Sequence, residues 1–406
     1  MSKFVFAWEL GAGYGHIDGF LPIAKILQRR GHEVTWVLKD LLYAPLLFTT
    51  YSFSYFQAPI CWPISHTAPA MNYAGILQNI GFNDKFGLLA RTQAWKTLFE
   101  YLNPDLILLD HAPTALLAAR SLHYPRALFG GSFFSPPRTR PMPSIRPWLN
   151  IAEKTLLNTE NEVVTIANSV LTQIGGPTLD TLADLFDIEE NFLCTYSELD
   201  HYSNRDNAIY WGSNFNDADG VEPVWPPGDK KRIFVYLKND YAGLETLLNQ
   251  LRSSSYSVLA HIPGINPAFI QKFSNVNLHI SPYPVKLSGI GETCDAVICH
   301  AGAGTAAAML LKGKPLMMLP MQVEQLLLAK KIALLGAGLC IPAEVKKANF
   351  PATIKELLTQ EYYKNNAEQF SKKYKNTHLQ KQQESIATRC EELLRTSQLS
   401  ATSVSM

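Results

Sequence analysis

The sequence predicts an α/β protein of two Rossmann-like domains, each built on a parallel sheet. Three observations predict this fold class. The chain has 406 residues, which is too long for one ordinary domain and suits two of about 200 residues. Short apolar segments alternate with helix-like segments in both halves, a pattern typical of parallel sheets whose faces are covered by helices. A glycine turn follows a predicted strand in each half, at residues 11–15 and 301–304.

The first half opens with a strand, a glycine turn, an amphipathic helix and a second strand, and two further strands follow. Alternation of this kind indicates strands that run parallel. The elements are expected at residues 3–10, 11–15, 21–30, 34–38, 106–109 (strand), 115–122 (helix) and 127–129 (strand).

The second half begins after a polar stretch rich in proline and glycine, which we interpret as a linker. Its strands are expected from residue 232, at 257–261, 296–299 and 316–319, with a further helix from Gln325. The predicted boundaries are a first domain at 1–212, a linker at 213–228, a second domain at 229–375, a helix at 376–396 that could pack back on the first domain, and a disordered tail at 397–406.

The composition describes a globular protein with a large core. Hydrophobic residues make up 47% of the chain and charged residues 17%, which excludes an intrinsically disordered chain. Lysine and arginine total 36, and aspartate and glutamate total 35. Because a dedicated nucleic-acid-binding protein carries a strong basic excess, we expect no nucleic-acid partner.

The six cysteines are scattered and contain no C-x-x-C pair. The sequence therefore suggests neither a zinc site nor a disulfide framework, and we expect reduced thiols in a cytoplasmic protein. The first residues lack a signal-peptide core, and no apolar stretch is long enough to span a bilayer. Peripheral membrane contact and the oligomeric state stay open.

A histidine and an aspartate follow two predicted strands of the first half. His16 lies just after the first glycine turn, and Asp110 ends the strand at 106–109. Both are therefore expected at the carboxyl edge of a parallel sheet, where such folds bind ligands. A histidine there can take a proton from a hydroxyl near neutral pH, and an aspartate can fix its tautomer. The pair predicts a general base.

The second glycine turn is suited to phosphate. His300 ends a strand, Gly302 and Gly304 let the backbone approach a ligand, and Thr305 can cap the following helix. Exposed N–H groups and the positive end of a helix dipole attract a phosphate group. Further on, Glu324 and Gln325 open another helix. A carboxylate beside an amide matches the vicinal hydroxyls of a sugar.

These spaced residues resemble the donor-binding signature of the UDP-glycosyltransferase superfamily, in the variant of bacterial antibiotic and sterol glycosyltransferases. Residues 15–17 and 30–35 resemble the amino-terminal signature of the same superfamily. The residues of the second half that carry the resemblance span about forty positions. They are the segment 300–305, the segment 313–315, Pro320, the pair Glu324 and Gln325, and the segment 336–338.

The resemblance implies a GT-B fold, in which two Rossmann-like domains face each other. It also implies an inverting transfer that needs no metal or other cofactor. The sugar, a hexose, would pass from a UDP- or dTDP-sugar to a hydroxyl of a small, apolar or lipid-like acceptor in the first domain. The implied roles are His16 as base and Asp110 as its partner, a diphosphate site of His300, Gly302, Ala303, Gly304 and Thr305, and sugar contacts from Glu324 and Gln325.

Three positions depart from the superfamily pattern. Ala308 stands where plant members carry a ribose-binding glutamate, and bacterial members of this variant lack that glutamate too. Where a tryptophan usually stacks on the base just upstream of the motif, this chain offers only Tyr283 and Pro284, and the base contacts are assigned to Tyr283 and Val285. Gly19 replaces a usual proline after His16.

Two segments have no assigned role. The aromatic-rich segment 51–86 could line an apolar acceptor pocket or could pack its loops on the core. The basic, proline-rich segment 133–148 could meet an anionic acceptor or a membrane surface, or could be a solvated loop. The acidic pair Asp217 and Asp219 mimics a metal signature, but it lies in the polar linker and we expect it to be solvated.

Three other functions are compatible with parts of the sequence. Gly11, Gly13 and Asp40 approach a dinucleotide-binding fingerprint, but His16 replaces its third glycine. A nucleotide-sugar epimerase or phosphorylase could share the GT-B layout. A non-catalytic partner of another glycosyltransferase would have no need of His16, Asp110, Glu324 and Gln325.

Overall fold

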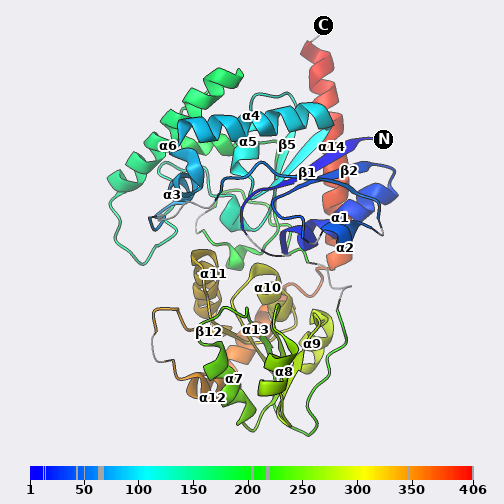
Figure 1. The fold of residues 1–406 in the computed structure, drawn as a ribbon, viewed down its shortest axis with the longest axis vertical. Coiled ribbons are helices and arrows are strands. Elements are labelled where there is room, and N and C mark those ends of the chain that lie inside the picture. Colours follow the sequence, from blue (N-terminus) through cyan, green and yellow to red (C-terminus); the bar gives the residue numbers. More distant parts are fainter. Residues whose placement is uncertain are drawn as a thin grey trace. The chain divides into compact units, whose positions relative to one another are not determined.

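The computed structural model describes residues 1–11, 13, 15–42, 44–49, 51–62, 68–202, 205–215, 220–345 and 348–404. They form two compact α/β units (Figure 1). Unit 1 comprises Met1–Thr195, Tyr202–Asn214 and Leu379–Met406, and unit 2 comprises Tyr196–His201 and Phe215–His378. The predicted linker 213–228 spans the change from unit 1 to unit 2 at Asn214, and its acidic pair at 217 and 219 lies outside the described residues.

Unit 1 contains a six-stranded sheet in the order β3-β2-β1-β4-β5-β6, with every neighbouring pair parallel. Four of these strands agree with the predicted ones. The other two, β3 and β6, were missed because each has only four residues, and β3 is largely exposed, so neither forms an apolar run. The strands are β1 (Lys3–Trp8), β2 (Glu33–Leu38), β3 (Ser54–Gln57), β4 (Leu106–Asp110), β5 (Arg126–Gly130) and β6 (Glu190–Leu193).

The first helix begins six residues before its predicted start. Gly19 and Pro22 are poor helix formers, but Ile17 and Phe20 are fully buried, so tertiary packing extends the helix back to Gly15. No helix in the described ranges is long and apolar enough to cross a membrane. The helices of unit 1 are α1 (Gly15–Arg29), α2 (Ala44–Phe48), α3 (Tyr73–Leu77), α4 (Lys85–Leu102), α5 (Pro113–Ala119), α6 (Glu153–Ile174) and α14 (Leu379–Val404).

Unit 2 repeats the sheet topology of unit 1. Read from one edge, its order is β9-β8-β7-β10-β11-β12, so in both units the chain reverses direction across the sheet beside the first strand. All pairs are again parallel. The strands are β7 (Arg232–Tyr236), β8 (Ser257–His261), β9 (Leu278–Ser281), β10 (Ala296–Cys299), β11 (Leu316–Met318) and β12 (Gly338–Cys340). The helices are α7 (Leu244–Arg252), α8 (Pro267–Phe273), α9 (Leu287–Thr293), α10 (Ala303–Leu311), α11 (Val323–Leu334), α12 (Phe350–Thr359) and α13 (Glu361–Lys373).

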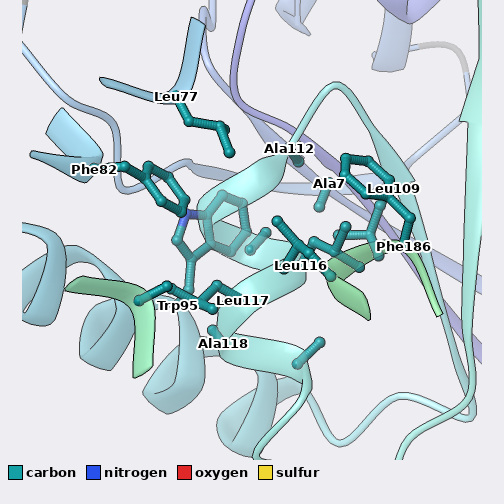
Figure 2. Close-up of a cluster of buried hydrophobic side chains, with 14 of the residues drawn as sticks. Ala7, Leu77, Phe82, Trp95, Leu109, Ala112, Leu116, Leu117, Ala118 and Phe186 are labelled. Atoms are coloured by element: carbon teal, nitrogen blue, oxygen red, sulfur yellow. The ribbon is translucent and has the colours of Figure 1, made fainter. Parts of the chain in front are cut away.

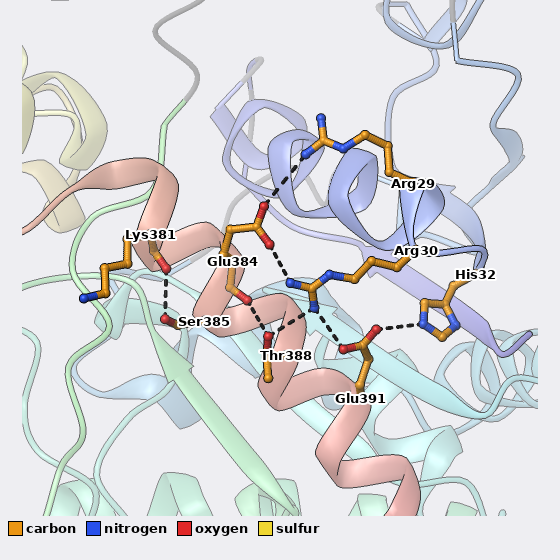
Figure 3. Close-up of polar contacts among 8 residues, drawn as sticks. All are labelled: Arg29, Arg30, His32, Lys381, Glu384, Ser385, Thr388 and Glu391. Atoms are coloured by element: carbon orange, nitrogen blue, oxygen red, sulfur yellow. Dashed lines mark hydrogen bonds and ion pairs between the residues drawn. The ribbon is translucent and has the colours of Figure 1, made fainter.

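The last helix, α14, packs against α1 in unit 1. Ile386 and Cys390 are fully buried in the core beneath it. At the edge of this contact between α14 and α1, Arg30 bonds Glu384 and Glu391, and Nε2 of His32 lies 2.9 Å from Glu391 (Figure 3). Exposed ion pairs contribute about 0–1 kcal/mol each, so the apolar contact carries most of the docking. The helix bounds include most of the segment 397–406, for which the sequence predicts a disordered tail.

The largest apolar cluster of unit 1 packs α4 and α5 against the sheet (Figure 2). Trp95 of α4 is fully buried there, and its indole N–H donates to the carbonyl of Pro59 at 2.9 Å. Because the Trp95 ring is large and fully buried, removing it would leave a cavity in this core.

We expect Trp95→Ala to lower the free energy of unfolding by about 3–5 kcal/mol, the usual cost of deleting a buried aromatic ring. Urea unfolding followed by circular dichroism measures the change. Tyr101→Ala is the matched control, because Tyr101 lies on the same helix and is 75% exposed. Equal effects of the two substitutions would contradict the packing argument.

Candidate active site

His16 and Asp110 meet at the point where the strand order of unit 1 reverses. The neighbouring strands β1 and β4 are in register with Trp8 opposite Asp110. Asp110 is the last residue of β4, and His16 lies in the first turn of α1, which follows β1. Open parallel sheets bind ligands at such a reversal. The structure therefore brings the two predicted residues to the expected edge.

The two side chains form a hydrogen bond in a nearly buried position. Nδ1 of His16 lies 2.9 Å from Oδ2 of Asp110, with 11% and 4% of the side chains exposed. Because a carboxylate only accepts, Nδ1 carries the proton and Nε2 is the basic nitrogen. The ring of Trp8 stacks on the imidazole at 5.0 Å between centroids. The bond and the stacking fix both the tautomer and the orientation of His16.

Two glycines make room for this pair. Gly11 has φ +86°, and a Cβ on it would lie 2.4 Å from Nε2 of His16. Gly130, at the end of β5, has φ +122°, and its Cβ would lie 2.9 Å from Oδ1 of Asp110. Both backbone conformations favour glycine. Any larger residue at either position would strain the backbone and displace a member of the pair.

Glu9 is a buried carboxyl group that the sequence interpretation included in the first strand and gave no role. Its Oε2 accepts hydrogen bonds from the N–H groups of Thr114 at 2.8 Å and Ala115 at 3.4 Å. Its Oε1 is buried without a partner among the described residues. Burial raises the pKa of Glu9 to about 7. An acidic residue at the end of an apolar strand was the sequence signal.

His111, next to Asp110, was also missed. It has φ +44°, and its ring stacks on Phe134 at 4.2 Å between centroids. Both ring nitrogens are buried and have no hydrogen-bond partner in the part of the chain that the structure describes. Burial lowers its pKa well below the ordinary value, and the charge of Lys39 and that of a protonated His16 lower it further. His111 is therefore uncharged at neutral pH.

In unit 2, His300 lies at the corresponding reversal of strand order. The neighbours β7 and β10 end with Tyr236 opposite Cys299, and His300 follows directly. Its Nε2 accepts the backbone N–H of Lys238 at 2.9 Å, and its Nδ1 donates to the carbonyl of Leu319 at 2.6 Å. Burial lowers the pKa of His300. The ring is thus neutral, and it links the ends of three strands.

The predicted diphosphate residues form one turn in the structure. Gly302 caps the N-terminus of α10, which begins with Ala303, Gly304 and Thr305. No neighbouring heavy atom lies within 4 Å of a Cβ placed on Gly302, and the nearest to one on Gly304 is Cβ of Phe215 at 3.9 Å. The first turn of the helix therefore borders open space that a ligand could fill.

The predicted sugar residues lie on the next helix. Glu324 and Gln325 are in the first turn of α11, and Oε1 of Gln325 accepts the N–H of Met321 at 2.8 Å. This bond closes the turn after β11, the strand beside β10. The structure thus places both residues on the strand connection adjacent to the glycine turn.

The predicted base contacts lie beyond β9. Tyr283 is 63% exposed, while the Val285 side chain is buried. Val221 pairs with this segment through the carbonyl of Pro284 and the N–H of Lys286. The bridge does not use the N–H or carbonyl of Val285 itself, and these are the main-chain groups that a base edge could bond.

The basic, proline-rich segment 133–148 is packed on unit 1. The N–H of Ile145 and the hydroxyl of Ser144 both bond the carbonyl of Met71, and Arg146 bonds that of Ala70. In the aromatic segment, Phe82 is fully buried and Trp62 is 83% exposed, while residues 63–67 lie outside the described part. Part of the aromatic segment therefore packs in the core.

Within the described ranges, no three His, Cys, Asp or Glu side chains are grouped to hold a metal ion.

Residues 274–393 match the family described as Erythromycin biosynthesis protein CIII-like, C-terminal domain. No curated protein sequence matches the chain. Among solved structures, the glycosyltransferase SnogD from Streptomyces nogalater has a TM-score of 0.61 at 18% identity, covering 95% of this chain and 99% of its own. Spinosyn rhamnosyltransferase SpnG gives 0.69 at 17%, covering 97% and 99%. VinC in complex with dTDP gives 0.66 at 15%, covering 98% and 99%.

The chain has the GT-B fold. The predicted fold class is thereby confirmed, including two parallel sheets of Rossmann type. The resemblance to bacterial antibiotic glycosyltransferases is confirmed for the region that carried most of the motif, because the family match includes residues 300–338. The roles of the individual site residues stay predictions.

We expect Glu9→Gln to change how stability depends on pH. Between the ordinary value of 4.5 and about 7, the folded protein binds more protons at Glu9 than the unfolded chain does. Raising the pH through this window therefore destabilises the wild type. The free energy of unfolding of the wild type minus that of Glu9→Gln should fall across the window, as measured by urea unfolding. A difference that does not change with pH would contradict a raised pKa.

Proposed function

We propose that the chain is an inverting, metal-independent glycosyltransferase that acts in the cytoplasm. It would move a hexose-type sugar from a UDP- or dTDP-sugar to a hydroxyl of a small, apolar or lipid-like acceptor. The observation that carries this proposal is the nearly buried hydrogen bond between His16 and Asp110 at the strand reversal of unit 1. The GT-B fold and the family match over residues 274–393 support it.

The chemistry follows from the tautomer of His16. Its Nε2 takes the proton of the acceptor hydroxyl while the hydroxyl oxygen bonds the anomeric carbon of the sugar. The bond between that carbon and the diphosphate oxygen breaks, and attack from the opposite face inverts the configuration. Asp110 stabilises the imidazolium that forms, since its carboxylate already accepts the Nδ1 proton.

Unit 2 would hold the donor. The first turn of α10, after Gly302, offers N–H groups and the positive end of a helix dipole to the diphosphate. Glu324 and Gln325 would bond the sugar, and Tyr283 and Val285 the base. A thymine base is favoured by two relatives, VinC in complex with dTDP and SpnG complexed with thymidine diphosphate. SpnG has also been solved with its spinosyn aglycone, a small acceptor.

The donor assignment is tested by calorimetric titration with UDP, dTDP and GDP, with NAD as the comparison. We expect one of the pyrimidine nucleoside diphosphates to bind and NAD not to bind. Binding of NAD alone would favour a dehydrogenase, and binding of none of them would overturn the proposal.

We expect His16→Ala to reduce turnover about a hundredfold or more, because it removes the general base. Asp110→Asn should also reduce it, since an amide can hold the wrong tautomer of His16. Affinity for the nucleoside diphosphate should hardly change, because both residues belong to unit 1. His123→Ala, at an exposed histidine of the same unit, is the control. Transfer that continues at the wild-type rate in His16→Ala would contradict the assignment.

A further inference from the structure

The diphosphate site needs a positive charge that His300 does not supply. As the donor bond breaks, negative charge builds on the leaving diphosphate, and fixed positive groups stabilise it. Both nitrogens of His300 are engaged by backbone groups, at 2.9 and 2.6 Å. Nε2 accepts in this arrangement, so protonating it would break the bond to Lys238. The imidazole is therefore a neutral link in the fold.

Lys238 carries a cationic side chain on the loop that is bonded to His300. It follows β7, the strand beside β10, and its backbone N–H is the group that bonds His300. The residue is exposed. After burial and the bond to Leu319, the positive charge of Lys238 is the next influence on the pKa of His300, which it lowers. The positive charge of Lys238 therefore acts on His300, two residues before the N-cap Gly302 of α10.

We infer that Lys238 binds the diphosphate and stabilises its charge as the sugar leaves, while His300 is the positioning residue that holds the Lys238 loop beside Gly302. This inference rests on the proposed function. An ammonium group suits this role because it is a compact charge with three donors. The step needs no further reactant, since the leaving diphosphate keeps the electron pair of the broken bond.

The same loop carries an opposing charge. Asp240 lies two residues on, is exposed, and raises the pKa of His300, opposite to the effect of Lys238. If the loop borders the diphosphate, removing this carboxylate should strengthen binding. The pair Lys238 and Asp240 therefore gives two substitutions with effects of opposite sign.

Calorimetry with inorganic pyrophosphate, dTDP and thymidine tests the inference at low ionic strength. We expect Lys238→Met to weaken pyrophosphate and dTDP binding about tenfold or more, the usual effect of losing a bond to a charged group. The loss should shrink at high salt, where charges are screened. Thymidine binding should not change, and Asp240→Asn should tighten diphosphate binding. Lys355→Met, at an exposed lysine of α12, should match the wild type.

The outcomes separate the inference from the proposal on which it rests. If the wild type binds dTDP and pyrophosphate and Lys238→Met binds them equally well, the inference is overturned and the proposed function stands. Equal losses in Lys238→Met and Lys355→Met would also overturn it, because the effect would then be one of net charge. If the wild type binds no nucleoside diphosphate at all, the proposed function itself fails.

Discussion

The parallel pairing of β1 with β4 brings together the groups on which the candidate chemistry of unit 1 depends. Its register sets Trp8 opposite Asp110, so the loop after one strand and the last residue of the other share one edge. The indole of Trp8 then lies against His16, and Oδ2 of Asp110 accepts a hydrogen bond from Nδ1 of His16. In unit 2 the pairing of β7 with β10 likewise brings Lys238 and His300 to one edge of the sheet, where the Lys238 N–H bonds His300. One topological constraint thus produces both candidate sites.

The edge of unit 1 concentrates polar groups that are costly to bury. Glu9, Asp110 and His111 each have a buried side-chain atom with no partner in the described part of the chain. Each such atom costs about 1–3 kcal/mol. Burial raises the pKa of Glu9 and lowers that of His111, so in both cases the uncharged form is favoured. Buried polar groups that lower the stability of the fold are typical of functional sites, where their chemistry is needed.

Strand ends were the most informative feature of the sequence. They allowed the prediction of His16, Asp110 and the glycine turn after His300. Short apolar strands are readable from the sequence, and the carboxyl ends of parallel strands lie at the edge of the sheet where ligands bind. Features that depend on tertiary packing were missed. The early start of α1 depends on burial of Ile17 and Phe20, and the burial of Glu9 depends on α5, about one hundred residues away. The backbone bonds of His300 join three separate segments, which no local pattern could reveal.

The docking of α14 on α1 means that unit 1 is not encoded by one continuous stretch of the gene. The chain changes unit after Thr195, His201, Asn214 and His378, and its end returns to the unit in which it began. A fragment ending at Asn214 would expose the apolar surface that Ile386 and Cys390 cover. Chimaeras that exchange unit 2 between proteins of this fold must therefore take both ends of the chain from one parent.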